Sequence, residues 1–191
     1  MKLLDAYAAL RHHDSDVKWS ASRLIMHEFL KGRKIPVSAV AMAFNILNGR
    51  AFDPDEEQNV RNISQDYLEK AMEAGLEKLV TIDSVAKDLT NKEPIIRILA
   101  VENLIISCEY DNDISAAIPA LEKTLKDPDI GVRRNAAFAF LILSEHEYDL
   151  SSSVKALEET ARNDSDMKVK KSASQAIENE KKSEERKKEY L

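Results

Sequence analysis

The sequence is poor in residues that break or cross-link a chain. Its 191 residues include one cysteine, four glycines and five prolines. A single cysteine excludes an internal disulfide, and so few glycines and prolines argue against a β-rich or loop-built enzyme scaffold. Cys108 shares an apolar helix face with Leu104 and Ile105, so we expect a buried, unreactive thiol.

Long apolar runs and a strong positive charge are also missing. No run approaches the ~18 apolar residues that cross a membrane, so no membrane partner is predicted. Residues 1–10 carry an acid and lead directly into an amphipathic pattern, which makes a cytoplasmic location the default expectation. The net charge is −6 and acids and bases are mixed along the chain, which disfavours nucleic acid as a partner.

What the sequence does contain is a five-fold repeat. In each copy a β-branched apolar residue, here called the marker, is followed by a base. A small residue stands four positions after the marker, and a large apolar residue stands eight positions after it. A fixed period in this range is typical of a solenoid, and offsets of four and eight fall on one side of a helix. The markers are Val17, Val60, Ile96, Val132 and Val169, spaced 43, 36, 36 and 37 residues apart.

A second amphipathic segment precedes three of the marker helices, and short polar turns link the two. Asp, Asn and Pro in these turns are typical of helix starts. The sequence therefore predicts an all-α solenoid of about five helical hairpins that form a single domain over residues 1–191. The approximate repeats are 2–31, 34–75, 76–109, 113–146 and 150–182, followed by a charged C-terminal tail at 183–191 that extends the last helix.

Residues 114–145 resemble a HEAT repeat of the short bacterial and archaeal kind, the group that includes phycobilisome-lyase-like repeats. The run from Ala117 to Ala137 carries this resemblance, which implies an α-solenoid with a right-handed superhelix. In this family the turn aspartate and the base after the marker bond between neighbouring repeats and form a ladder. We interpret the corresponding turn residues as stacking residues; they are Asp55, Asn91, Asp127 and Asp164.

The second helices of such hairpins line the inner, concave surface, and offsets two and six from the marker are free to vary. Aromatic residues and Arg, which are enriched in protein interfaces, occur there. We therefore predict a non-catalytic scaffold or adaptor that binds a protein partner, with partner and oligomeric state unidentified. The predicted contact residues are Trp19, Arg23, His27, Glu102, Arg134, Phe138, Lys171 and Gln175. Trp19 and Phe138 could equally be buried by a neighbouring repeat.

Other protein families with HEAT-like repeats suggest alternative functions. Deoxyhypusine hydroxylase, a HEAT-repeat family, holds two irons through His-Glu pairs, but the matching positions carry no ligand here, so no metal, cofactor or catalytic residue is predicted. A HEAT-like DNA-alkylation-repair or other nucleic-acid-binding protein would place Trp19, Arg134 and Lys171 against bases and phosphates. A bilin-lyase-like enzyme or accessory subunit has similar repeats, although no bilin motif is present.

Overall fold

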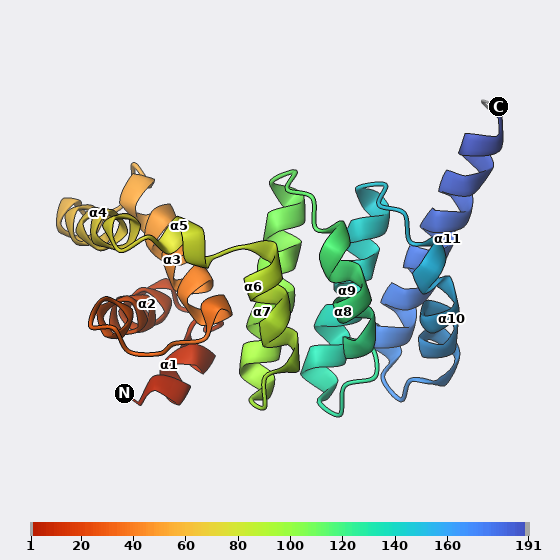
Figure 1. Cartoon of the computed structure of the whole chain (residues 1–191), viewed down its shortest axis with the longest axis horizontal. Coiled ribbons are helices and arrows are strands. Elements are labelled where there is room, and N and C mark those ends of the chain that lie inside the picture. The colour runs from red at the N-terminus through yellow and green to blue at the C-terminus, as the bar shows by residue number, and fades with distance from the viewer. Residues whose placement is uncertain (1, 190–191) are drawn as a thin grey trace. The chain divides into compact units, whose positions relative to one another are not determined.

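The computed structural model describes residues 2–189, with side chains from residue 2 to residue 187, and consists of helices joined by turns (Figure 1). No strand occurs in this range, so the predicted all-α fold of helical hairpins is confirmed. The chain divides into two compact units, which we call unit 1, ending at Asp88, and unit 2, beginning at Leu89. The prediction of one continuous domain stays a prediction.

Unit 1 is built around the long helix α2. This helix begins after Asp14, whose carboxylate accepts hydrogen bonds from the backbone N–H groups of Asp16 and Val17. It packs against α1, α3 and α4 through buried residues that include Ala21 and Ile25. The helices are α1 (Leu3–Ala9), α2 (Ser15–Leu30), α3 (Val37–Phe52), α4 (Gln58–Glu73), α5 (Leu76–Leu79) and α6 (Ile82–Lys87).

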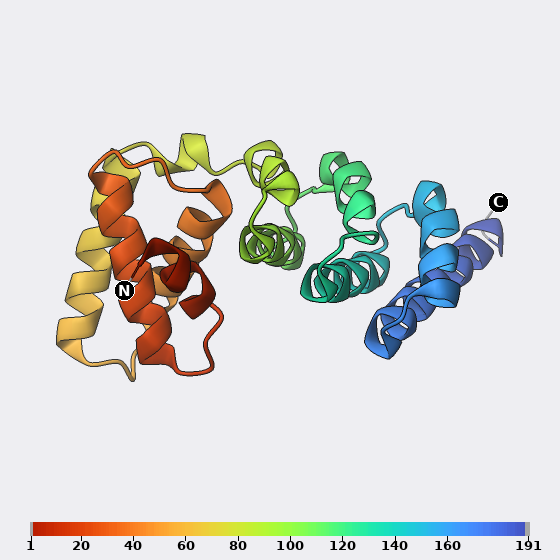
Figure 2. The ribbon, with the colours of Figure 1, turned by 90° about the horizontal axis from the view of Figure 1, so that it is seen from below.

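Unit 2 places its helices in two layers (Figure 2). One layer holds α7 (Pro94–Glu109), α9 (Ile130–Glu145) and α11 (Met167–Glu189), with α9 packed against both neighbours. The other holds α8 (Ile118–Thr124) against α9 and α10 (Val154–Asn163) against α11. Each of α8 and α10 follows a short 3₁₀ turn, at Ser115–Ala117 and Ser151–Ser153.

The repeated apolar pattern forms the core of unit 2. The markers of α7, α9 and α11 are buried, and so are the alanines four positions after them. These small side chains let neighbouring helices approach closely, as the pattern predicted. Cys108 is also buried, which raises the pKa of its thiol, so the expectation of an inaccessible cysteine is confirmed.

The charged segment at the C-terminal end continues α11 as far as Glu189, so the predicted helix extension is confirmed for the described part. Residues 190 and 191 of the predicted tail lie outside the described residues. The charged end of α11 is not uniformly solvated, because Glu180, shortly before the predicted tail, and Ser183, its first residue, are buried. None of the described helices is both long and apolar enough to span a membrane.

Candidate partner-binding face

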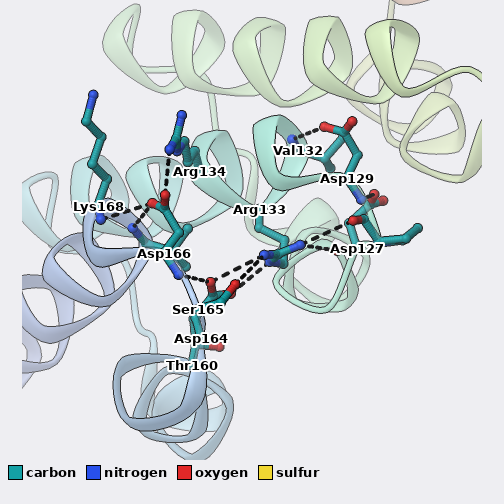
Figure 3. Close-up of polar contacts among 12 residues, drawn as sticks. Asp127, Asp129, Val132, Arg133, Arg134, Thr160, Asp164, Ser165, Asp166 and Lys168 are labelled. Carbon is teal, nitrogen blue, oxygen red and sulfur yellow. Dashed lines mark hydrogen bonds and ion pairs between the residues drawn. The ribbon is translucent and has the colours of Figure 1, made fainter.

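Two arginines join the turns of successive repeats in unit 2. Arg97 on α7 donates from Nε and Nη2 to the two carboxylate oxygens of Asp127, each at 2.7 Å. Arg133 on α9 donates to Asp164 from Nε at 2.8 Å and from Nη2 at 3.4 Å (Figure 3). The ladder implied by the family resemblance is therefore confirmed at Asp127 and Asp164.

Each ladder arginine also holds the turn that precedes its own helix. Nη1 of Arg133 donates to the carbonyl oxygens of Asp127 and Pro128, at 2.9 and 3.3 Å, and Arg97 makes the equivalent pair of bonds. The turn is closed internally as well, because Oδ1 of Asp127 accepts the backbone N–H of Asp129 at 2.8 Å. A planar guanidinium can make all these bonds at once. One arginine thus fixes both its own turn and the next repeat.

The ladder pair on α9 is held in its charged form. Burial alone would raise the pKa of Asp164, but the hydrogen bonds from Arg133 and from the backbone outweigh it and lower that pKa. The same contact raises the pKa of Arg133. Near neutral pH the repeats are therefore joined by two full opposite charges, which strengthens these bonds relative to neutral ones.

The structure corrects the predicted ladder residue of unit 1. Asp53, not Asp55, forms the turn there: its Oδ1 accepts the N–H of Asp55 at 2.9 Å, and Arg61 donates to the carbonyls of Asp53 and Pro54 at 3.2 and 3.0 Å. The segment from Asp53 to α4 is two residues longer than the equivalent segment from Asp127 to α9. Asp55 therefore does not occupy the position in its turn that Asp127 occupies. No ion pair between Asp55 and Lys18 exists among the described contacts.

Asn91 occupies the corresponding position at the start of unit 2. Its Oδ1 accepts the backbone N–H of Glu93 at 3.0 Å, so it closes the same kind of turn as Asp127. The turn leads directly into Pro94, the first residue of α7. The bond that the ladder would make from Asn91 to the preceding repeat stays a prediction.

With the repeats in register, equivalent positions of α7, α9 and α11 form rows across one layer. We define the second-helix face as the residues at offsets −2, +2 and +6 from the markers of these helices, since residues four apart lie above one another on a helix. All of its residues on α9 and α11 are exposed. On α9 they are Ile130 (42% exposed), Arg134 and Phe138 (45% exposed), and on α11 they are Met167 (75% exposed), Lys171 and Gln175.

Arg134 links this face to the next repeat. Its Nη2 lies 2.5 Å from Oδ2 of Asp166, and this contact lowers the pKa of Asp166 to about 2 (Figure 3). Asp166 also caps α11 by accepting the N–H groups of Lys168 and Val169, at 3.0 and 3.1 Å. Arg134, predicted as a partner contact, thus has a structural partner while its side chain remains exposed.

The face is largely covered at α7. Ile98 is buried there, and a side chain carbon added to Gly131 of α9 would lie only 3.1 Å from Cδ1 of Ile98. The glycine therefore permits the close approach of the two helices. Glu102, another predicted contact, is half-buried. The accessible part of the second-helix face consequently lies on α9 and α11.

The three predicted contacts of unit 1 lie on α2. Trp19 is partly buried, with Nε1 donating to Oγ of Ser64 on α4 at 3.0 Å. The guanidinium carbons of Arg23 and Arg50 lie 4.5 and 5.9 Å from its ring centroid. Trp19 and Arg23 are therefore engaged inside unit 1, while His27 is exposed. That these three residues form one continuous binding surface with the second-helix face stays a prediction.

Ile130 and Met167 are members of the face that the sequence analysis missed. Four large apolar side chains of unit 2 are prominently exposed in the described range, and three of them belong to this face: Ile130, Phe138 and Met167. The fourth is Tyr110. The sequence alone could have identified them, because Ile130 and Met167 stand four residues before the predicted contacts Arg134 and Lys171 and so share their helix face.

Elsewhere in unit 2 a shallow pocket of about 420 Å³ lies between the turns that follow α7 and α9. Its lining includes Cys108, His146 and Glu147, with several further acids. Among the described residues no three His, Cys, Asp or Glu side chains are grouped so that they could hold a metal ion.

Comparisons with known proteins agree with a helical-repeat fold. A family model described as non-SMC mitotic condensation complex subunit 1 matches residues 95–190, just over half of the chain. The chain is also similar to the crystal structure of an engineered protein, with 16% identity over 96% of this chain and 98% of that one and a TM-score of 0.34, a likeness too distant to carry an argument. Curated protein sequences gave no match. The phycobilisome-lyase-like subtype stays a prediction.

Proposed function

The chain belongs to the family described as non-SMC mitotic condensation complex subunit 1, and from this premise we propose that it is a non-catalytic scaffold that holds a protein partner on its second-helix face. A subunit of a complex must bind other proteins, and the matched residues include both exposed helices of this face. We also propose the cytoplasmic location that is expected from the sequence.

The observation that carries the proposal is the exposed Phe138 on α9, the helix that packs between α7 and α11. Ile130 and Arg134 lie on the same face of α9, and Met167 lies on the same face of the neighbouring helix α11. Aromatic residues, Met and Arg are the types enriched in protein interfaces. The ladder already fixes the backbone beneath them, so little order would have to be gained on binding.

The test replaces Phe138 by the photo-crosslinking residue benzoylphenylalanine in the full chain. The control carries the same residue at Lys123, an exposed position of α8 in the opposite layer. After irradiation in cells that express the protein, mass spectrometry should identify a protein linked at position 138 and absent from the control. Equal labelling from both positions would refute the proposal.

A binding measurement with the identified protein then gives the size of the effect. Truncation of an interface aromatic often costs 1–3 kcal/mol, so Phe138→Ala should weaken binding by about tenfold or more. The side chain is nearly half exposed, so the variant should keep its far-ultraviolet circular dichroism spectrum. A folded variant that binds with unchanged affinity would contradict the role of Phe138.

A further inference from the structure

We propose that the segment held by the second-helix face is an acidic amphipathic helix, with apolar side chains about two turns apart and carboxylates beside them. This inference rests on the proposed function and specifies the chemistry of the partner. It follows from the juxtaposition of exposed apolar side chains on α9 and α11 with unpaired cations on α11. No other part of unit 2 combines these two features among its described residues.

The apolar residues set the spacing of the partner. Ile130 and Phe138 are eight residues apart on α9, which corresponds to about 12 Å along the helix axis. Apolar side chains seven or eight residues apart on a second helix span about 10–12 Å and would reach both. Met167 of α11 adds a flexible, polarisable side chain that can adapt to the occupant.

The cations set the charge of the partner. Lys171 of the face and Lys168, which follows Met167 at its edge, are exposed, and neither ammonium group makes a hydrogen bond or ion pair within the described residues. In Figure 3 the side chain of Lys168 extends away from the ladder contacts. The nearby carboxylate of Asp166 is already bonded to Arg134 and to the start of α11. Positive charge that no neighbour neutralises therefore remains beside the apolar residues.

A protein segment fits this surface better than nucleic acid does. The two free lysines are about one helical turn apart on α11, which also carries Met167, and the neighbouring α9 carries Ile130 and Phe138. Phosphates would leave these three apolar side chains uncovered. Nucleic-acid sites instead depend on many clustered cations. Carboxylates on an amphipathic helix would pair with the lysines while its apolar side chains cover Ile130, Phe138 and Met167.

The test uses fluorescently labelled helical peptides and the full chain. One peptide carries leucines on one face, including a pair seven residues apart, and glutamates at the flanking positions; the matched peptide carries lysines in place of the glutamates. In fluorescence anisotropy the acidic peptide should bind at least about tenfold more tightly. Lys168→Glu with Lys171→Glu should reverse this preference. Lys123→Glu with Lys155→Glu, the same charge change on α8 and α10, should leave it unchanged.

Several results would overturn the inference. One is equal binding of both peptides, or binding that the double reversal at positions 168 and 171 does not alter. Another is tight, salt-sensitive binding of duplex DNA that the reversal abolishes and Phe138→Ala does not affect, which would assign the lysines to phosphates. If neither peptide binds while crosslinking at position 138 still captures a protein, the proposed function stands and the acidic-helix inference fails.

Discussion

Replacing Asp127 by alanine should show how strongly the arginine ladder stabilises unit 2. Asp127 accepts two hydrogen bonds of 2.7 Å from Arg97, and the two side chains are only 9% and 10% exposed. The change removes both bonds and the bond that closes the turn at Asp129. It also leaves the guanidinium of Arg97 without a countercharge in a nearly buried position.

The expected cost follows from that buried charge. Removing one partner of a buried ion pair costs about 3–5 kcal/mol because the other charge remains desolvated. Arg97 keeps its bonds to the carbonyl oxygens of Asn91 and Lys92, at 2.7 and 3.2 Å. These acceptors offset part of the loss, so we expect the free energy of unfolding to fall by about 3 kcal/mol, the lower end of that range.

An exposed ion pair of the same unit provides the control. Lys126 of unit 2 lies 2.8 Å from Glu159 of the next repeat, but the side chains are 63% and 53% exposed. Exposed pairs contribute at most about 1 kcal/mol, so Lys126→Ala should have a small effect.

The assay is urea denaturation followed by far-ultraviolet circular dichroism. With a slope of about 2 kcal/mol per molar urea, Asp127→Ala should lower the midpoint by about 1.5 M, and the control by less than about 0.5 M. If the two variants shift the midpoint equally, the ladder does not carry the stability assigned to it.

Two further predictions concern pH. The folded-state pKa of Asp166 is lowered from 3.8 to about 2, mainly by Arg134, so its stabilising effect is present above about pH 4 and is lost as the pH falls toward 2. Asp166→Asn should therefore flatten the pH dependence of the thermal midpoint in this window, and an unchanged slope would contradict the assignment. Burial raises the pKa of Glu180 above 4.5, so its ionisation costs stability as the pH rises beyond that value. Glu180→Gln, which keeps an acceptor for the N–H of Leu150, should raise the thermal midpoint at neutral pH but not near pH 4; a lower midpoint at neutral pH would show that the charge is favourable.

The repeat period predicted the helices and two of the four ladder residues because both depend on local spacing. Asp127 and Asp164 each stand five residues before a marker, and the structure pairs them with Arg97 and Arg133. The same count failed at Asp55. Counting back from the marker assumes a turn of constant length, and the turn before α4 is two residues longer.

The exposed apolar residues were harder to find. Ile130 and Met167 begin their helices, where an apolar residue is usually assigned to the core, and whether a neighbouring repeat covers them depends on tertiary packing. Trp19 shows the opposite case. It stands at an offset predicted to be free, yet it is hydrogen-bonded to Ser64 across two packed helices of unit 1. An offset defines a helix face, but only the neighbouring element decides whether that face is accessible.

Arg133 and Arg134 show why residue type alone does not separate stacking from binding. They are adjacent on α9, where successive side chains differ by about 100° in direction. Arg133 bonds to Asp164 of the next turn, and Arg134 bonds to Asp166 two residues later. Because Asp166 also caps α11, truncating Arg134 would disturb the stack as well as the face. Phe138 takes no part in these hydrogen bonds, so its variants should report on partner binding without breaking the ladder.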